Sequence, residues 1–328
     1  MMACTAFAAC TGSSVASAAT MSAVAYPEMK RLNYSDRLAT GTIAAGGALG
    51  ILIPPSTIFI ILGIITEQSI GTLFIAGLLP GIMLAGLFMV LIFVMTKVNP
   101  ALGPPGQSST WKEKFIALTG IWGMMVLFIL VLGGLYFGVF APSEAGTIGA
   151  FGAFILALTK RTPRNALQKA LVETAQTTAY ILLILIGASI FNTFLALGGV
   201  SSAIGNWILS LSMSPMLTVI VILAIYIPLG MFIDPLGAIL LTVPVFFPLV
   251  TQLGFDPIWF LVLVCVMTEL GLITPPVAIN VYVVQGVTRV PMEQVFRGIV
   301  PFALVFVIGI ALLVAFPQIS LFLPGTMK

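Results

Sequence analysis

Histidine is absent from this sequence, and charged side chains are scarce. Only 7% of the 328 residues are Asp, Glu, Lys or Arg, and the formal net charge is +3. The lack of histidine removes the commonest metal ligand and the commonest general base. Because the sequence also has no nucleophile motif, we do not expect an enzyme. The small net charge gives no reason to expect binding to nucleic acid.

Cysteine is also scarce. Cys4, Cys10 and Cys265 lie in apolar surroundings and show no paired loop spacing. No disulfide framework is therefore predicted. We expect the three residues to be small apolar side chains in the protein interior.

The residues that are abundant are hydrophobic and make up 60% of the chain. Apolar stretches of about 20 residues recur, which is the length that a helix needs to cross the hydrocarbon core of a bilayer. No soluble domain has this composition. The predicted fold class is therefore an all-α polytopic membrane protein.

Two of the predicted membrane helices are interrupted by paired prolines, in LGILIPPS at 49–56 and LGLITPP at 270–276. Proline has no backbone N–H, so each pair leaves two carbonyls, four residues earlier, without helical partners. In hydrocarbon such carbonyls persist only where protein, an ion or a water-filled cavity satisfies them. Simple packing kinks are the alternative interpretation. The prolines are Pro54, Pro55, Pro275 and Pro276, and the freed carbonyls belong to Gly50, Ile51, Gly271 and Leu272.

The two interrupted segments indicate an internal repeat. Leu49 and Leu270 are separated by 270 − 49 = 221 positions. The same offset, without a gap, relates Pro27 to Pro248, Gly77 to Gly298, Pro80 to Pro301, and Ser13 to Asp234. A complete repeat is predicted to cross the membrane five times. Because five is an odd number, the two copies would have opposite orientations in the membrane. We therefore predict an inverted-repeat, ion-transporter-like fold with two re-entrant hairpins and two Pro-Pro-broken helices.

The offset also predicts the boundaries of the elements. The first repeat, 1–107, would contain a hairpin over 1–27, a broken helix over 38–66 and a helix over 70–97. The second repeat, 108–328, would contain helices over 114–138, 143–159 and 174–197, a hairpin over 216–250, a broken helix over 257–286 and a helix over 298–323. The first repeat lacks counterparts of three helices and of part of its hairpin, so we expect about a hundred residues upstream of Met1 to be missing.

The basic residues favour one orientation in the membrane. In the predicted topology, twelve of the thirteen Lys and Arg residues fall on one face and only Lys328 falls on the other. An excess of Lys and Arg marks the cytoplasmic side, so we expect the C-terminus to be periplasmic. The twelve are Lys30, Arg31, Arg37, Lys97, Lys112, Lys114, Lys160, Arg161, Arg164, Lys169, Arg289 and Arg297.

The hairpin tips and the interrupted helices predict two cation sites. Orphaned carbonyls at half-helix C-termini suit a small hard cation, whereas half-helix N-termini suit an anionic group. One predicted site consists of Gly230, Gly271, Thr274 and Val277. The equivalent site in the other predicted repeat consists of Gly50, Ile53, Ser56 and Ser13, with the hydroxyls of Ser14 and Thr11 beside it.

Substrate contacts are predicted from polar residues at membrane depth. An acid within the bilayer is a functional candidate, but Asp234-Pro235 is equally suited to cap a helix. Glu269 has the same two interpretations, as a functional acid or as a hydrogen-bonding post between helices. The asparagines are either substrate contacts or hydrogen bonds between helices. The substrate-contact candidates are Ser13, Ser14, Asp234, Asn280 and Asn192.

Five segments carry a resemblance to a known family: TGSSVA at 11–16, AAGGALGILIPPS at 44–56, LFIAG at 73–77, GMFID at 230–234 and LGLITPP at 270–276. Together they resemble the large membrane subunit of TRAP (tripartite ATP-independent periplasmic) transporters. The resemblance covers essentially the whole chain. It implies secondary active import of organic anions, such as C4-dicarboxylates, keto acids or sugar acids, across the bacterial inner membrane by a sodium-coupled elevator.

The resemblance also implies partners and coupling ions. A periplasmic substrate-binding protein would deliver the substrate, and a small four-helix membrane subunit would accompany this chain. Sodium ions would bind around the hairpins and the Pro-Pro breaks, and no cofactor is expected. Two other interpretations stay open: a stand-alone divalent-anion/sodium symporter or ion exchanger of similar fold, and an inactive truncated fragment.

Overall fold

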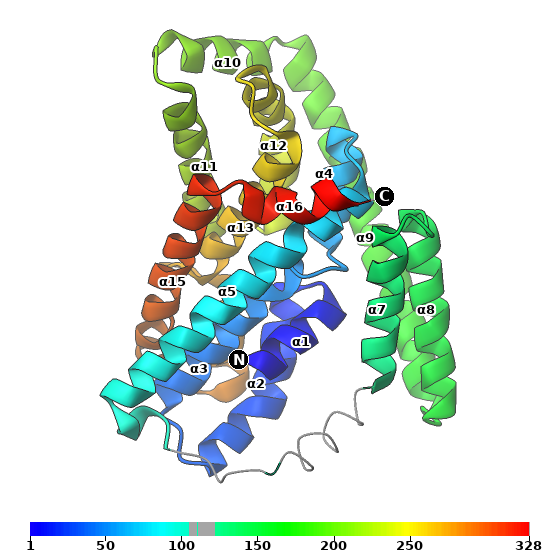
Figure 1. Cartoon of the computed structure of the whole chain (residues 1–328), viewed down its shortest axis with the longest axis vertical. Coiled ribbons are helices and arrows are strands. Elements are labelled where there is room, and N and C mark those ends of the chain that lie inside the picture. The colour runs from blue at the N-terminus through cyan, green and yellow to red at the C-terminus, as the bar shows by residue number, and fades with distance from the viewer. Residues whose placement is uncertain (105–109, 111–121, 328) are drawn as a thin grey trace. The chain divides into compact units, whose positions relative to one another are not determined.

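The computed structural model describes residues 1–104, 110 and 122–327, and these residues form helices and connecting turns with no β-strand (Figure 1). The predicted all-α class is confirmed. Within this part of the chain, five helices are long and apolar enough to cross a membrane. They are α5 (Ile70–Val98), α9 (Arg164–Leu197), α11 (Pro215–Phe232), α12 (Pro235–Gln252) and α15 (Met292–Ala315).

The chain divides into two compact units. Unit 1 comprises Met1–Gly106 and Ile204–Thr326, and unit 2 comprises Gln107–Ala203 with the last two residues. Unit 1 therefore combines the predicted first repeat with the hairpin and broken helix of the predicted second repeat. The short helix α10 (Val200–Ser210) begins in unit 2 and continues into unit 1.

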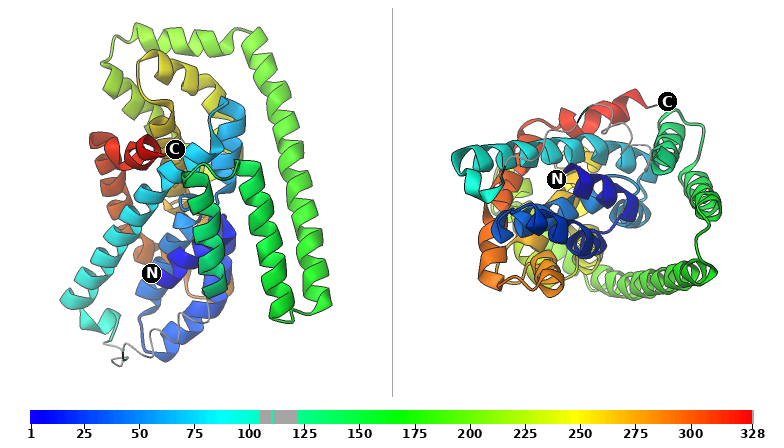
Figure 2. Two further views of the ribbon diagram at one scale, coloured as in Figure 1. Left: turned by 45° about the vertical axis from the view of Figure 1, so that its right-hand side comes forward. Right: turned by 90° about the horizontal axis from the view of Figure 1, so that it is seen from below.

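Unit 2 contains α7 (Trp122–Tyr136), α8 (Pro142–Thr159) and α9, and α7 packs against α8. The predicted helix over 114–138 begins outside the described residues. The prediction of a helix over 174–197 was too short, because α9 begins at Arg164, directly after Pro163. No proline or glycine interrupts the polar stretch that follows, so the helix is continuous with its apolar part (Figure 2).

The core of unit 1 is α13 (Pro257–Ile273), in which every residue from Ile258 to Ile273 is buried. A helix that is apolar on all sides is stable only when other elements surround it. The helices that pack against α13 include α11, α12, α15 and α5. The acid Glu269 therefore lies in the most enclosed helix of the unit.

Two pairs of helices occupy the predicted hairpin ranges. Only Gly12 and Ser13 separate α1 (Met2–Thr11) from α2 (Ser14–Arg31), and only Ile233 and Asp234 separate α11 from α12. The helices of each pair pack against each other. The first prediction ended at residue 27, but α2 continues through Pro27 to Arg31.

Both paired-proline segments interrupt their helices. The first interruption lies between α3 (Asp36–Gly47) with its 3-10 turn η1 (Ala48–Ile51) and α4 (Thr57–Thr66). The second lies between α13 and α14 (Ile279–Thr288). The peptide bonds Pro54–Pro55 and Pro275–Pro276 are both cis.

The last part of the chain differs from the prediction of one helix over 298–323. The structure has α15, which begins at Met292, followed by α16 (Gln318–Thr326). Phe316 leaves the helical conformation, with φ −127° and ψ 76°. The reason is Pro317, because a proline disfavours the helical conformation of the residue before it. A second short 3-10 turn, η2 (Pro100–Leu102), follows α5.

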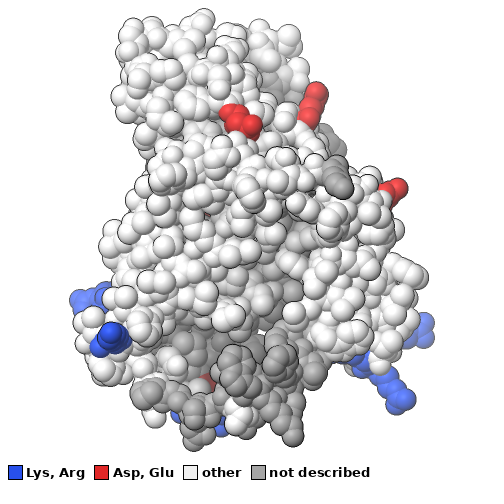
Figure 3. All heavy atoms as spheres, viewed as in Figure 1, with Lys and Arg blue, Asp and Glu red and all other residues white. Residues whose placement is uncertain are grey.

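The surface is mostly uncharged. Figure 3 shows few Lys, Arg, Asp and Glu side chains on the visible face. Many large apolar side chains are exposed, among them Phe93 on α5, Leu183 on α9 and Leu304 on α15. This distribution fits helices whose outer faces contact lipid.

Candidate functional site

The first interruption lies against the tip of the α1–α2 pair. Gly12 has φ +60°, a conformation that glycine adopts readily. A Cβ added to Gly12 would lie 2.6 Å from the carbonyl oxygen of Pro55. A Cβ added to Gly50 would lie 3.1 Å from the carbonyl oxygen of Ser13. The backbone of the tip therefore touches both the 3-10 turn before the prolines and the second proline itself.

Hydroxyl groups gather around this contact. The Ser13 Oγ accepts a hydrogen bond from the Ala16 N–H over 3.4 Å and caps α2. The hydroxyl oxygens of Thr11 and Ser17 lie 2.5 Å apart. Small hard cations prefer oxygen ligands, and the described residues contain no group of three His, Cys, Asp or Glu that could hold a metal. Any cation here would bind to carbonyl and hydroxyl oxygens.

The other two residues of the first predicted site have separate structural roles. Ser56 is fully buried, and its Oγ accepts a hydrogen bond from the Phe59 N–H over 3.3 Å, which caps α4. The Ile53 side chain faces α5, where a Cβ added to Gly81 would lie 2.6 Å from its Cγ1. Ile53 can therefore contribute only its backbone to a cation site.

The second interruption lies against α11 through two glycines. A Cβ added to Gly271 would lie 2.6 Å from the Cα of Gly230, and one added to Gly230 would lie 2.9 Å from the Thr268 carbonyl oxygen. The Thr274 hydroxyl donates a hydrogen bond to the Leu270 carbonyl over 2.5 Å. The structure therefore brings Gly230 and Gly271 into contact and places Thr274 one turn beyond Leu270.

Val277, the fourth residue of this predicted set, lines an open cavity of about 450 Å³ with Ile279, Tyr282 and Val283. The cavity lies where α14 begins. Its lining is almost entirely apolar, so the side chain of Val277 offers nothing to a cation. Only its backbone carbonyl can take the predicted role.

Asp234 caps α12. Its Oδ2 accepts a hydrogen bond from the Leu236 N–H over 3.0 Å, and Pro235 is the first residue of the helix. The capping interpretation of Asp-Pro is confirmed. The residue is exposed, so capping leaves its carboxylate accessible.

Asn280 is fully buried near the start of α14, and neither its amide nitrogen nor its amide oxygen has a hydrogen-bond partner among the described residues. The hydroxyls of Thr42 on α3 and Ser22 on α2 are buried and unpartnered in the same sense. The helices α2, α3 and α14 pack against one another. A buried polar group without a partner costs about 1–3 kcal/mol, so this region favours a bound polar ligand or water.

Sequence reasoning missed Thr42 and Ser22. Hydroxyls in membrane helices commonly bond to the carbonyl one turn earlier, and the sequence does not show which ones fail to do so. Asn192, by contrast, was predicted as a substrate contact and lies in α9 of unit 2. Its role as a substrate contact stays a prediction.

Glu269 belongs to neither predicted cation site, but the structure connects it to Ser14, which lies beside the first. Its side chain is fully buried, and the Ser14 hydroxyl donates a hydrogen bond to its Oε1. The hydroxyl of Ser14 therefore points to α13 and not to the interruption at Gly50. The signal for Glu269 was present in the sequence as a lone acid within an apolar run.

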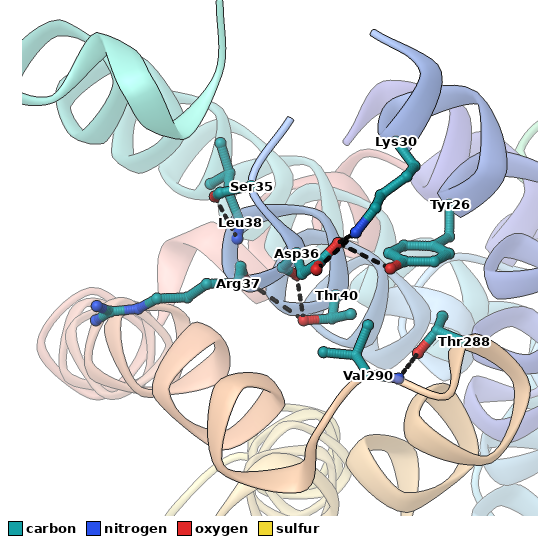
Figure 4. Close-up of polar contacts among 9 residues, drawn as sticks. All are labelled: Tyr26, Lys30, Ser35, Asp36, Arg37, Leu38, Thr40, Thr288 and Val290. Carbon is teal, nitrogen blue, oxygen red and sulfur yellow. Dashed lines mark hydrogen bonds and ion pairs between the residues drawn. The ribbon is translucent and has the colours of Figure 1, made fainter. Parts of the chain in front are cut away.

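A polar cluster ties α2 to α3 at the far end of the α1–α2 pair (Figure 4). The Asp36 Oδ1 accepts hydrogen bonds from the Tyr26 hydroxyl over 2.8 Å and from the Lys30 Nζ over 2.6 Å. Partial burial works against ionisation of Asp36, but the bonds from Lys30 and Tyr26 outweigh it and lower the pKa of the carboxyl below its ordinary value. Nearby, the Arg37 Nε donates to the Arg297 carbonyl over 2.9 Å.

The chain matches one family model over residues 1–319, that of the Tripartite ATP-independent periplasmic transporter, DctM component. It is 34% identical over 328 residues to the C4-dicarboxylate TRAP transporter large permease protein DctM of Pseudomonas aeruginosa. That alignment covers 99% of this chain and 76% of the relative.

Other relatives carry different substrate names. The sialic acid TRAP transporter large permease protein SiaM of Vibrio cholerae is 30% identical over 326 residues, with 99% of this chain and 76% of the relative covered. The 2,3-diketo-L-gulonate TRAP transporter large permease protein YiaN of Escherichia coli is 32% identical over 312 residues, with 94% and 72% covered. The family match over residues 1–319 and these relatives show that this chain belongs to the DctM family of TRAP transporter large permeases, multi-pass membrane transport proteins that are not enzymes.

Proposed function

We propose that this chain is the permease subunit of a secondary active transporter that imports organic anions across the inner membrane by coupling them to sodium. The observation that carries the proposal is the pair of contacts between interrupted helices and helix-pair tips, at Gly12–Pro55 and at Gly230–Gly271. Each contact sets backbone carbonyls beside a place where the helix cannot bond to itself. Carbonyl oxygens of this kind suit sodium.

The two contacts are the proposed cation sites. The first uses the carbonyls near Gly50 and Ile53 with the hydroxyl of Ser13. The second uses the carbonyls near Gly230 and Gly271 with the hydroxyl of Thr274, whose oxygen keeps lone pairs after it donates to Leu270. Ser56 and Val277 contribute backbone carbonyls to the first and second site, respectively.

The substrate is proposed to be an organic carboxylate. The substrates named for three of the relatives, a C4-dicarboxylate, sialic acid and diketogulonate, are carboxylic acids, and a further relative is named for isethionate, a sulfonate. In unit 1 the buried amide of Asn280 has no hydrogen-bond partner among the described residues, and the start of α14 presents the positive end of a helix dipole. We assign Asn280 and the exposed Asp234 to the substrate path, with Ser13 at its edge. We assign Ser14 the contact with Glu269.

The transport cycle is proposed to use the inverted repeat. The two interrupted segments, related by 221 positions, would form a moving body in an elevator, and the C-terminus would be periplasmic. Relatives named as permease DctMQ and as permease SiaT are longer than this chain, which covers 51% and 52% of them. They support a second, small membrane subunit, and the name of the family supports a periplasmic binding protein.

Uptake into proteoliposomes tests the proposal. The full chain, reconstituted with the small membrane subunit of the same system, is expected to take up radiolabelled succinate or a sugar acid only when a sodium gradient and the loaded binding protein are present. Uptake that ignores sodium would contradict the coupling. Uptake that needs no binding protein would identify a stand-alone symporter instead.

A further inference from the structure

A hydrogen bond joins the α1–α2 helix pair to α13, the helix before the second interruption. Ser14 is the first residue of α2, and its hydroxyl donates to the Oε1 of Glu269 in α13. The two residues are 255 positions apart in the chain. The Glu269 side chain is fully buried, and its Oε2 has no hydrogen-bond partner among the described residues. Ser14 is therefore its one direct polar link within that part of the chain.

The two residues joined by this hydrogen bond each lie next to one of the proposed cation sites. Ser14 follows Ser13, whose carbonyl oxygen meets the backbone at Gly50, and Glu269 precedes by two residues the glycine that touches Gly230. One end of the bond lies at the first proposed cation site and the other end at the second. This one hydrogen bond therefore connects the two proposed cation sites directly.

The bond has no counterpart in the other copy of the repeat. The offset of 221 relates Ser14 to position 14 + 221 = 235, a proline, and Glu269 to position 269 − 221 = 48, an alanine. Pro235 has no hydroxyl to donate, and Ala48 has no side-chain acceptor. The feature is therefore not part of the shared scaffold that both copies need in order to fold.

We propose that the Ser14–Glu269 hydrogen bond couples the two cation sites, so that a cation bound at one raises the affinity of the other. A cation at the first site would hold the α1–α2 tip in place. Ser14 would then hold Glu269 and the following turn, including Gly271, in the arrangement that binds the second cation. Binding of the second cation would then require less ordering of the protein, and this produces positive cooperativity. Glu269 acts as a positioning residue, and the inference depends on the proposed sodium sites.

The test is equilibrium binding of radioactive sodium to the purified full chain in detergent, without substrate or partner proteins. Two coupled sites predict a Hill coefficient approaching about 2 for the unchanged chain. Coupling between sites usually changes affinity by about 5- to 150-fold. For two sites the midpoint shifts by the square root of that factor, so loss of the coupling should raise the half-saturating sodium concentration by about 2- to 12-fold and bring the Hill coefficient to about 1.

Two substitutions at one position separate the hydrogen bond from the carboxyl group. Glu269→Leu removes both, whereas Glu269→Gln removes the carboxyl group but keeps a carbonyl oxygen that can accept from Ser14. We expect Glu269→Leu to lose cooperativity and Glu269→Gln to keep it. Ser14→Ala should lose cooperativity as well, and adding it to Glu269→Leu should cause no further loss.

The control is Thr20→Ala. It removes a hydroxyl from the same helix, at an exposed position that belongs to neither proposed cation site. It should leave the Hill coefficient unchanged. Elution of every variant as a single species in size-exclusion chromatography establishes that it is folded.

Each adverse result is distinct. If the unchanged chain binds no sodium, the proposed sites and the coupling are both wrong. If it binds sodium with a Hill coefficient of about 1, the sites stand and the coupling is wrong. If Glu269→Leu and Ser14→Ala keep the cooperativity of the unchanged chain, the two sites are coupled by some other route and this assignment is overturned.

Discussion

The two helix interruptions have similar amino-acid sequences but differ in how they are packed. At the first, Gly50 meets the tip of a helix pair whose residues carry hydroxyls, and an added Cβ would lie 3.1 Å from Ser13. At the second, Gly271 meets another glycine, and an added Cβ would lie 2.6 Å from the Cα of Gly230. The aligned glycines Gly50 and Gly271 therefore differ: hydroxyl-bearing residues lie beside the first, and the backbone of another helix lies closer to the second. The two segments, which are 221 positions apart, therefore share a backbone break but differ in its surroundings.

The largest expected effect is at Gly271, the glycine with the closer neighbour. In Gly271→Ala the added Cβ would lie 2.6 Å from the Cα of Gly230, a backbone atom that can move only with α11. Overpacking of this kind costs about 1–3 kcal/mol. We expect a lower thermal unfolding midpoint in detergent and a loss of sodium binding.

The comparison with the first contact sharpens this prediction. In Gly50→Ala the closest atoms would lie 3.1 Å away, so a smaller loss is expected. Gly286→Ala on α14 is the control, because nothing lies within 4 Å of its added Cβ. Equal losses in Gly271→Ala and Gly50→Ala would show that these two glycines have equally close neighbours, contrary to the structure.

The next effect concerns the only hydroxyl in the second proposed site. Thr274→Val removes an oxygen ligand and keeps the shape of the side chain. Because a polar contact to a charged group contributes about 1.5–3 kcal/mol, we expect sodium affinity to fall about tenfold or more. Thr274→Ser should restore it. A sodium response that is the same in Thr274→Val and the unchanged chain would remove this hydroxyl from the site.

A smaller effect distinguishes the half-helices that follow the two interruptions. Ser56 caps α4, whereas Ala278 at the start of α14 has no side-chain cap. Ser56→Ala should lower the free energy of unfolding by about 1 kcal/mol, which is typical of a lost cap. Ser56→Asn should recover most of the loss because its side-chain oxygen can also cap. If Ser56→Ala unfolds at the same temperature as the unchanged chain, the cap does not stabilise the first interruption.

The smallest effect is expected at the Lys30–Asp36 ion pair, which the positions 221 residues later cannot form. The offset of 221 places Thr251 and Pro257 at the corresponding positions, 30 + 221 and 36 + 221. The pair is largely exposed, with 57% of the Lys30 side chain accessible, so Asp36→Asn should cost less than about 1 kcal/mol.

The pH dependence of this effect has a definite sign. The pKa of Asp36 is lower in the folded protein than its ordinary value of 3.8, because its bonds with Lys30 and Tyr26 outweigh the opposing effect of burial. The stabilisation is therefore fully present above that ordinary value and is lost as the pH falls through the lower, folded-state value. Thermal unfolding of the unchanged chain and of Asp36→Asn should differ at pH 6 and converge toward about pH 3. A difference that grows as the pH falls would contradict the assignment.

Much of the fold could be predicted because its causes are local. Prolines at 54, 55, 275 and 276 remove backbone donors wherever they occur, so both interruptions were predictable. Asp234-Pro235 is a helix start by its own chemistry, and the tip near Gly12 follows from a short run of small polar residues. The division at Phe316 was also local, since Pro317 causes it, but the prediction missed it.

The candidate site was harder to predict because its contacts join distant residues. The sequence does not show that the Ser14 hydroxyl turns from the first interruption to Glu269, or that the Ile53 side chain faces α5. It also does not show which buried polar groups lack partners, as Asn280 does among the described residues.

The sequence by itself determined the membrane class, the family and the positions of the two helix interruptions. The length of the apolar stretches indicates the class, the short motifs indicate the family, and the missing backbone donors of the prolines fix the interruptions. Each of these is a local property of the chain. Only the tertiary structure decided how Leu270–Pro276 and its counterpart at Leu49–Pro55 are surrounded. The contact of Gly271 with Gly230 and the bond from Ser14 to Glu269 depend on how closely whole helices approach each other, and that distance results from the packing of all their side chains together.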